Sequence, residues 1–283
     1  MPVHPSSSVQ AVREELATRL RELRTSVVPR LTARALAHAC GWHESKVSKI
    51  EAGKQSVIDD DIRAWCHACG TEEEADSLVV LNHRLDKSYV EWRRAMAKGL
   101  VDLQGSFVPR WEKTRHFKVY EPGVIPGLCQ TAGYAEAVLS AVARFYRMSS
   151  DPAEAAQART ARNRLLNERG RRFAFLVEET VLRQRIGDSD MAEQLRHLLA
   201  VASLPNVYLG VIPFGVPRWL FPVEGFWIYD DEEVLVETVS AQLNITDPRE
   251  VGLYVRTFET LAGFAVHGNR ARESLHAALT ALG

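Results

Sequence analysis

The sequence predicts a mainly α domain at the amino-terminal side, followed by an α+β domain. Three observations lead to this prediction. Residues 31–54 have the composition of a short helix, a tight turn and a second short helix, and residues 9–24 carry apolar side chains at helical spacing. After residue 118, short apolar runs typical of buried strands are grouped between amphipathic helices, which favours an α+β domain over a repeated βαβ unit.

The length and the composition agree with two globular domains. Of the 283 residues, 46% are hydrophobic, as is normal for a chain with a buried core. We place the first domain at residues 1–84, a helical connector at residues 85–118 and the second domain at residues 119–283. The net charge of −1 excludes a chain that is basic throughout, but residues 1–56 contain nine Lys or Arg and only five Asp or Glu.

No part of the sequence indicates export or a membrane. The first residues, MPVHPSSS, lack the apolar core of a secretory signal, and no stretch approaches the ~20 apolar residues of a membrane span. Four cysteines in a chain of this length do not form a disulfide scaffold. We therefore expect a cytoplasmic protein that does not contact membranes.

The first helix is expected at residues 9–24, where four apolar residues at spacings of three and four form one stripe. The stripe consists of Val12, Leu16, Leu20 and Leu23. We expect this stripe to pack on the two short helices at Leu36, Val47 and Ile50. A further helix at residues 59–69 begins with three Asp residues, which suit the positive end of the helix dipole.

The two short helices have recognisable ends. Thr32 can cap the first helix with its hydroxyl, and Gly41 supplies the backbone freedom that the turn needs. His43 or Glu44 begins the second helix, and Gly53 ends it. The exposed face of the second helix is polar. Side chains that donate and accept hydrogen bonds can contact base edges in the major groove of DNA, while Lys and Ser also hold phosphates.

Residues 35–54 match the pattern A-L-A-x-x-x-G-W-x-x-S-K-V-S-K-I-E-x-G-K and resemble the helix-turn-helix of the Cro/lambda-repressor class, often called the XRE family. The resemblance implies binding to double-stranded DNA. On that basis, base contacts are expected from Glu44, Ser45 and Lys49. Phosphate contacts are expected from Thr32, His43, Lys46, Ser48 and Lys54.

Two features qualify this resemblance. Ala33 stands where the class usually has a Gln that clamps a phosphate, so that contact is not expected here. The local positive charge is also small, so one copy should bind DNA weakly, and we expect a homodimer that recognises a roughly palindromic site. A pair of helices with a purely structural role is the alternative interpretation.

The second domain has predicted strands at residues 173–177 and 206–213, and a hairpin at residues 225–239. Helices are predicted at residues 132–145, 152–168, 188–203, 247–261 and 269–282. The helix at residues 152–168 and the residues just after it are rich in Arg. We interpret this helix as a solvated one whose charges pair locally, with contact to DNA or to an acidic partner as the alternative.

Two segments of the second domain are similar to the DUF5753 domain of actinobacterial helix-turn-helix regulators. They are V-Y-E-P-G-V-I-P-G-L-C-Q-T-A-G-Y-A at residues 119–135 and Q-L-R-H-L-L-A-V-A-S-L-P-N-V-Y-L-G-V-I-P-F at residues 194–214. Some members are described as antitoxin-like, of the Scr1 family, and many are encoded beside small acidic DUF397 proteins. The resemblance implies a regulator whose second domain senses a small-molecule effector or binds a partner.

Two parts of this domain are candidates for ligand or partner binding. Tyr120 and Glu121 begin a turn that either presents groups to a ligand or sets the direction of the next helix. The loop PFGVPRWLFPVEGF is unusually apolar, and we expect its aromatic residues to be exposed. They are Phe214, Trp219, Phe221, Phe226 and, directly after it, Trp227. The candidate residues are therefore Tyr120, Glu121, Trp219, Phe221 and Trp227.

The sequence carries no pattern of an enzyme or a metal site. It has no Gly-rich phosphate loop, no G-x-S-x-G elbow and no H-E-x-x-H pair. Cys66 and Cys69 lack a second pair of ligands at the spacing that zinc needs. We expect no cofactor, no metal and no catalytic activity. The sequence favours a dimeric, sequence-specific transcription regulator, and the alternative is an antitoxin-like module that captures a small acidic DUF397-type protein.

Overall fold

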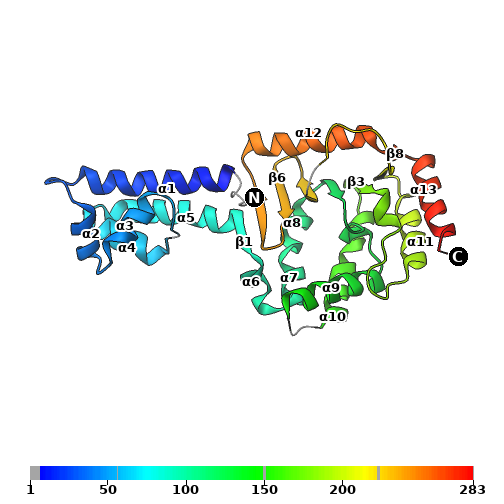
Figure 1. Cartoon of the computed structure of the whole chain (residues 1–283), viewed down its shortest axis with the longest axis horizontal. Coiled ribbons are helices and arrows are strands. Elements are labelled where there is room, and N and C mark those ends of the chain that lie inside the picture. The colour runs from blue at the N-terminus through cyan, green and yellow to red at the C-terminus, as the bar shows by residue number, and fades with distance from the viewer. Residues whose placement is uncertain (1–6, 56, 149–150, 222–223, 283) are drawn as a thin grey trace. The chain divides into compact units, whose positions relative to one another are not determined.

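The computed structural model describes residues 7–55, 57–148, 151–221 and 224–282 (Figure 1). The chain forms two compact units, Met1–Val90 and Glu91–Gly283. Most of the segment predicted as a connector, residues 91–118, therefore belongs to the second unit. Residues 1–6 and the side chain of Val12 lie outside the described residues.

Within the first unit, the described residues up to 88 form helices joined by turns and loops. Its elements are α1 (Ser7–Ser26), α2 (Ala33–Ala39), α3 (Glu44–Glu51), α4 (Asp59–Cys69), the 3-10 turn η1 (Glu72–Glu74) and α5 (Ala75–Ser88). Leu16 and Leu20 of the predicted stripe are buried together with the apolar side of α2 and α3, as expected. The indole of Trp65 in α4 fills the centre of this core and donates a hydrogen bond of 2.9 Å to the carbonyl of Leu20.

The second unit alternates helices and strands. After β1 (Tyr89–Glu91), its first part contains α6 (Trp92–Ala95), η2 (Met96–Lys98), α7 (Leu100–Ser106), α8 (Val108–Lys113), β2 (His116–Glu121), η3 (Gly127–Cys129), α9 (Ala132–Tyr146), α10 (Pro152–Thr160) and η4 (Ala161–Asn167). Its second part contains β3 (Arg172–Glu178), η5 (Glu179–Leu182), α11 (Met191–Val201), β4 (Val207–Ile212), β5 (Phe226–Tyr229), β6 (Glu233–Glu237), β7 (Ala241–Ile245), α12 (Pro248–Phe264), β8 (Val266–His267) and α13 (Asn269–Thr280).

The strands form one mixed sheet of order β1-β7-β6-β5-β2-β3-β4-β8. The pairs β2–β3 and β3–β4 are parallel, and the pairs from β2 through β5 and β6 to β7 are antiparallel. The predicted α+β class is confirmed, as are β3, β4 and the β5–β6 hairpin. Strands β2 and β7 were not predicted, because charged or polar residues occupy alternate positions in both strands.

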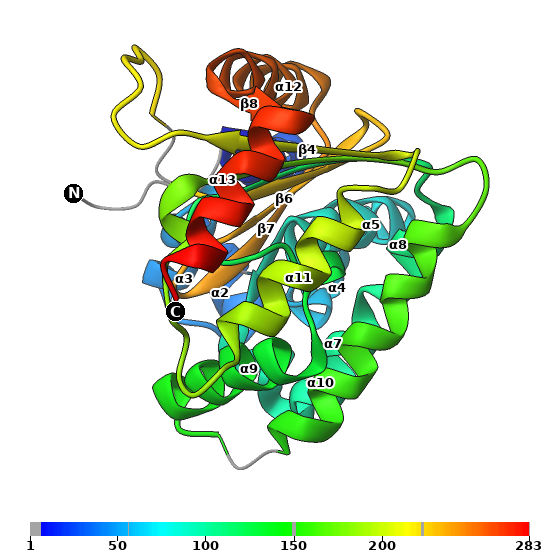
Figure 2. The ribbon, with the colours of Figure 1, turned by 90° about the vertical axis from the view of Figure 1, so that its right-hand side faces the viewer.

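Both faces of this sheet are buried. Figure 2 shows α12 on one face and α9, α10 and α11 on the other. Within β2, Phe117 and Val119 belong to the core under the helices α7 to α11, whereas Tyr120 belongs to the core under α12. Neighbouring residues of one strand point to opposite faces, so each strand supplies two separate cores.

The predicted helix over residues 152–168 was too long. The α-helix α10 ends at Thr160, and the chain continues as the 3-10 segment η4. In η4 the side chain of Arg162 turns inward, where its guanidinium donates to the carbonyl of Gln104 at 3.0 Å. The prediction that this Arg-rich stretch is a solvated helix is therefore wrong for Arg162, which is only 6% exposed.

Two glycines of the second unit allow a matched test of the packing. A Cβ atom at Gly210 in β4 would lie 2.5 Å from Leu176 Cδ2 and 2.6 Å from His267 Cε1, whereas a Cβ atom at Gly252 in α12 would meet nothing within 4 Å. We expect Gly210→Ala to lower the free energy of unfolding by ~1–3 kcal/mol through overpacking. We expect Gly252→Ala to raise it by ~0.5–1 kcal/mol, since Ala is the better helix residue. Urea unfolding of both variants measures these free energies. Equal changes for the two variants would contradict the close packing at Gly210.

Candidate nucleic-acid interface

The sequence positions the candidate recognition helix α3 through caps at both of the short helices. The hydroxyl of Thr32 accepts a hydrogen bond of 3.1 Å from the Ala35 amide at the start of α2, as predicted. The Nδ1 atom of His43 caps α3 by accepting from the Ser45 amide at 3.2 Å. Gly41 has a φ of 69°, in the left-handed region, so the turn between the helices suits glycine.

One side of α3 is buried and the other is open. Val47 and Ile50 are 0% and 1% exposed, which fixes the rotation of the helix about its axis. The exposed residues of α3 include Glu44, Ser45, Ser48 and Lys49. The three predicted base-contacting side chains, Glu44, Ser45 and Lys49, therefore all lie on the accessible surface of this helix. A protruding helix face of this polarity has the chemistry needed to contact base edges.

Four of the five predicted phosphate contacts are also accessible. Thr32, Ser48 and Lys54 are exposed, and the ammonium group of Lys54 has no partner among the described side chains. His43 is exposed as well, but its Nδ1 atom is occupied by the cap and by the Ser45 hydroxyl at 2.8 Å. Because Nδ1 accepts from an amide, the proton of the neutral ring lies on Nε2, which can donate to a phosphate.

Lys46 does not lie free for a phosphate. Its ammonium group makes an ion pair of 2.7 Å with Asp61 at the start of α4 and lies 4.1 Å from the ring centroid of Trp42. The acidic residues at the start of α4 therefore neutralise one of the positive charges of the recognition helix. Lys46 connects α3 to α4 in this structure, and a phosphate contact would compete with Asp61.

A buried ion pair that the sequence reasoning missed holds α3 to α1. The guanidinium of Arg24 donates to both carboxylate oxygens of Glu51, at 2.5 and 2.9 Å, and to the carbonyl of Leu31 at 2.8 Å. The hydrogen bond to Glu51 raises the pKa of Arg24. The pair joins the last turn of α1, the start of the α2 region and the last turn of α3. A charge at the end of an otherwise apolar stripe was the only sequence signal for this contact.

The candidate partner-binding residues of the second unit divide into exposed and buried ones. Phe214, Trp219 and Phe221 are 82%, 75% and 76% exposed, as expected for the apolar loop. Phe226 and Trp227 are buried, at 1% and 7%, so the expectation that they are exposed is wrong. Both belong to β5, where they point to opposite faces of the sheet and enter different cores.

Tyr120 is buried in a polar network on the face of the sheet that α12 covers. Its hydroxyl donates to Glu178 at 2.8 Å, and the guanidinium of Arg218 donates to the same carboxylate at 2.7 and 3.2 Å. Burial and Glu178 raise the pKa of the Tyr120 hydroxyl. At 2% exposure, Tyr120 is not a direct contact for a partner, which corrects its assignment from the sequence.

Glu121 points to the opposite face. Its Oε1 atom accepts a hydrogen bond of 2.7 Å from the indole nitrogen of Trp227. The pKa of Glu121 is raised from 4.5 to about 8, mainly by burial and in second place by the nearby carboxylate of Glu237. The two neighbours Tyr120 and Glu121 therefore belong to two separate environments.

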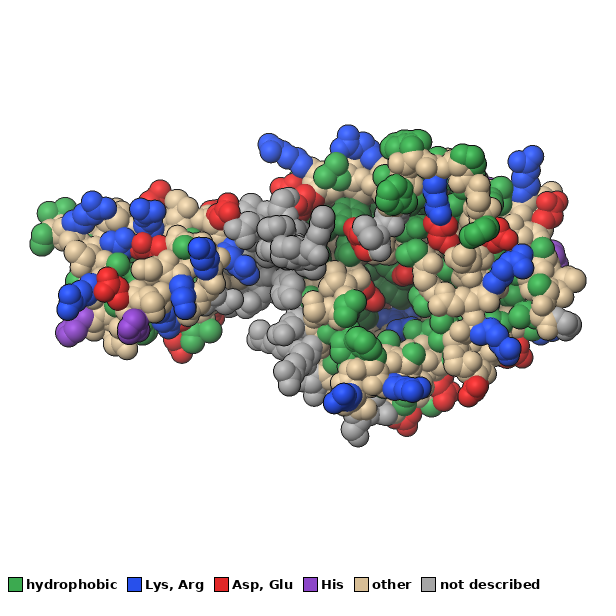
Figure 3. All heavy atoms as spheres, in the orientation of Figure 1, with side chains coloured by type: hydrophobic (Ala, Val, Ile, Leu, Met, Phe, Trp, Pro, Cys, Tyr) green, Lys and Arg blue, Asp and Glu red, His purple; other side chains and the backbone are tan. Residues whose placement is uncertain are grey.

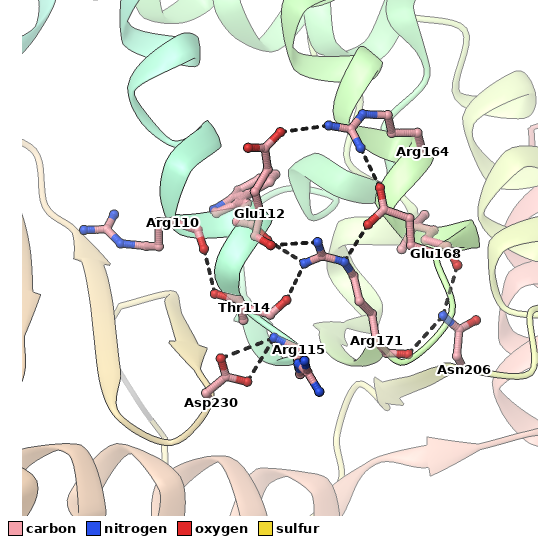
Figure 4. Close-up of polar contacts among 11 residues, drawn as sticks. Arg110, Glu112, Thr114, Arg115, Arg164, Glu168, Arg171, Asn206 and Asp230 are labelled. Carbon is pink, nitrogen blue, oxygen red and sulfur yellow. Dashed lines mark hydrogen bonds and ion pairs between the residues drawn. The ribbon is translucent and has the colours of Figure 1, made fainter.

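Two further Arg side chains of the run after α10, those of Arg164 and Arg171, contact residues of other elements (Figure 4). Arg171 donates to the carbonyls of Trp111 and Glu112 at 2.7 and 2.8 Å and to Glu168 at 2.8 Å. Arg164 bridges Glu112 and Glu168 at 3.0 and 2.5 Å. These contacts join α8 to the entry of β3, and they agree with the predicted local pairing of the charges.

Neither a metal site nor a membrane span is found in the part of the chain that the structure describes. No group of three or more His, Cys, Asp or Glu side chains is placed there to hold a metal ion. Cys66 and Cys69 are buried free thiols, and burial raises the pKa of both. No described helix is both long enough and apolar enough to span a bilayer.

Comparison with known protein families assigns both parts of the chain. The family described as "Domain of unknown function (DUF5753)" matches residues 105–277, and a "Helix-turn-helix domain" family matches residues 15–78. No curated protein matches significantly. A solved structure of TrmBL2, an archaeal chromatin protein, matches with 14% identity over 79% of this chain and 70% of that one. Its TM-score is 0.34, too low to support an argument about this chain.

The buried Arg24–Glu51 pair should contribute strongly to the stability of the first unit. We expect Arg24→Met to lower the free energy of unfolding by ~3–5 kcal/mol, because it leaves the Glu51 carboxylate partly buried without a partner. The matched control is Asp76→Asn, which removes the exposed ion pair with Arg63 and should cost ~0–1 kcal/mol. Thermal unfolding measures both. Similar losses of unfolding free energy for the two variants would contradict a strong contribution from the Arg24–Glu51 pair.

The raised pKa of Glu121 makes stability depend on pH. The folded chain holds this proton up to about pH 8, whereas the unfolded chain releases it near 4.5. The contribution of Glu121 to the free energy of unfolding is therefore largest below pH 4.5 and decreases as the pH rises to about 8. We expect Glu121→Gln to flatten this decrease in urea titrations across that range. Glu232→Gln, at an exposed turn position, should leave it unchanged.

Proposed function

Because the chain belongs to the DUF5753 family and carries a helix-turn-helix domain, we propose that it is a sequence-specific, DNA-binding transcription regulator that acts as a dimer in the cytoplasm. The observation that carries this proposal is the open polar face of α3. Glu44, Ser45 and Lys49 are accessible there, while Val47 and Ile50 hold the helix in place. In this proposal α3 enters the major groove of double-stranded DNA.

Each exposed side chain of α3 has a chemical role in the proposal. Glu44 accepts a hydrogen bond from a cytosine amino group, and Lys49 donates to a guanine. The hydroxyl proton of Ser45 is directed to His43, so Ser45 acts as an acceptor toward a base. Thr32, His43, Ser48 and Lys54 contact phosphates, whereas Lys46 remains paired with Asp61.

We expect a dimer because one copy of the helix-turn-helix domain should bind DNA weakly. With Lys46 neutralised and Ala33 unable to clamp a phosphate, one helix-turn-helix has few charges to offer the DNA backbone. Two copies bound to the two halves of a palindromic site add their contacts, with recognition helices about one turn of DNA apart. The second unit then binds an effector or a partner that controls the first. We propose no catalytic role for it.

A second candidate function is an antitoxin-like module that captures a small acidic protein. The observation in its favour is a recess of the second unit at the amino ends of the parallel strands. The recess is lined by Arg115, Lys118, Arg171 and Arg172, against a single acidic residue, Asp231. Lys118 is already paired with Asp231, at 2.8 Å, and Arg171 is held by carbonyl groups, so two exposed guanidinium groups remain for a partner.

Selection of bound sequences from a random DNA pool by the full-length chain tests the regulator. We expect one enriched site with two-fold symmetry, and no enrichment by a folded, dimeric protein would favour the antitoxin-like module. Within the enriched site, Lys49→Ala should cost ~1–3 kcal/mol of binding free energy and relax the preference at one base pair. Lys54→Ala should weaken binding to all sequences about equally. A changed preference in Lys54→Ala would contradict its assignment to a phosphate.

A further inference from the structure

The face of the sheet under the helices changes from apolar to charged within one row of residues. Val119, Trp227 and Leu235 are neighbours across β2, β5 and β6, and all three belong to the core. The register places the row that contains Glu121, Gly225 and Glu237 two positions further along these strands. Residues of one row point to the same face, so both carboxylates face the helices.

Gly225 leaves the space between the two carboxylates open. A Cβ atom on Gly225 would lie 2.9 Å from Glu121 Oε2 and 3.1 Å from Pro122 Cδ. The carboxylate of Glu121 therefore extends across the glycine toward the strand that carries Glu237. Any larger residue at position 225 would push this carboxylate away.

The carboxylate of Glu237 lies in a recess. Its side chain is accessible to solvent, yet burial by surrounding protein raises its pKa. A group that is both accessible and desolvated lies inside a concave surface. Figure 3 shows such a hollow in the second unit, with acidic and basic side chains inside it and hydrophobic side chains around them. The side chain of Glu237 makes no hydrogen bond or ion pair with the described residues.

A guanidinium group faces the two carboxylates from the helical side. Arg159 of α10 donates to Gln104 Oε1 at 3.1 Å and to Gln130 Oε1 at 3.0 Å. Its charge lowers the pKa values of both Glu121 and Glu237, so it lies near them. In the described part of the chain it nevertheless forms no ion pair with either carboxylate. Opposite charges thus face each other across an open space.

The segment that identified the DUF5753 resemblance converges on this space. Glu121 provides one carboxylate, and Gly127 lies beside the stem of Arg159, with its missing Cβ 4.0 Å from Arg159 Cδ. Gln130 orients the guanidinium and is itself held by a hydrogen bond of 2.7 Å to the carbonyl of Ile125. The turn between β2 and α9 therefore shapes a charged pocket as well as directing the next helix.

We propose that Glu121, Glu237 and Arg159 bind a small zwitterion of the amino-acid type. Its ammonium group lies between the two carboxylates above Gly225, and its carboxylate binds the guanidinium of Arg159. Such a molecule supplies Glu237 and Arg159 with the opposite charges that the free protein does not bring into contact with them, and it offers Glu121 a cation once Glu121 has released its proton. A ligand with a single charge would leave one end of the pocket uncompensated.

Ligand binding should also change the protonation state of Glu121. Glu121 is surrounded by Glu237 from β6, Arg159 from α10, Tyr134 from α9 and Tyr120 of its own strand. Since its pKa is about 8, it is mostly protonated at neutral pH without a ligand. An ammonium group placed beside it lowers that pKa, so binding near pH 7 releases a proton. The role of this ligand as an effector depends on the proposed function, whereas its binding is measured without DNA.

Isothermal titration calorimetry of the full-length chain with L-phenylalanine tests the proposal. The matched probes are phenethylamine, which lacks the carboxylate, and N-acetyl-L-phenylalanine, which lacks the ammonium group. We expect L-phenylalanine to bind more tightly than either. Titrations in two buffers of different ionisation enthalpy should reveal proton release, and Glu121→Gln should abolish that release. Absence of binding by L-phenylalanine, or equal binding by a singly charged probe, overturns the proposal.

Variants separate ligand binding from folding. Glu237→Gln and Arg159→Lys should each weaken L-phenylalanine binding by about ten- to a hundredfold, because the first loses the negative charge that faces the ammonium group and the second loses the two parallel N–H donors that face the carboxylate. The control Glu232→Gln, on the same hairpin, should bind as the parent does. Without ligand, Glu237→Gln should melt at the same temperature as Glu232→Gln or higher. A lower melting temperature for Glu237→Gln would assign this carboxylate to the fold and overturn the proposal. A failure of the ligand-binding proposal would leave the result of the DNA selection unaffected, because ligand binding is measured without DNA.

Discussion

The constraint that shapes the second unit is the burial of both faces of a mixed sheet. Each central strand must supply mainly apolar residues to both faces. Polar groups that enter this interior must find partners there. Arg110 does so by pairing with Glu233 at 2.8 Å, and Arg162 does so through Gln104. Glu237, at the end of the β2–β5–β6 rows, stands out because its carboxylate pairs with no side chain in the described part of the chain.

The first unit obeys a different constraint, since its recognition helix is too short to be stable alone. An isolated helix of eight residues is marginal in water, so α3 depends on contacts with the rest of the unit. Val47 and Ile50 provide the apolar part of those contacts, and Glu51 and Lys46 provide ionic ones to α1 and α4. The same side chains that stabilise the helix also determine which of its residues point outward.

Contacts between near neighbours could be predicted from the sequence, whereas contacts between distant residues hid parts of both units. The hydroxyl cap at Thr32 and the glycine turn at Gly41 are formed by near neighbours, and both were correctly inferred. The ion pair of Arg24 joins residues 27 positions apart, which no periodicity reveals. Strand β2 was missed because His116 and Lys118 interrupt its apolar residues. Trp227 was misplaced because an aromatic loop and a buried strand share the same composition.

The close approach of Glu121 to Gly225 links two positions that are more than one hundred residues apart in the sequence. A side chain at position 225 fits only if residue 121 becomes shorter or turns away. Among relatives of this chain, the two positions should therefore covary: glycine should accompany the acid, and a larger residue should appear only where the acid is lost. An alignment would then separate members that keep this pocket from members that have filled it, without any ligand being known.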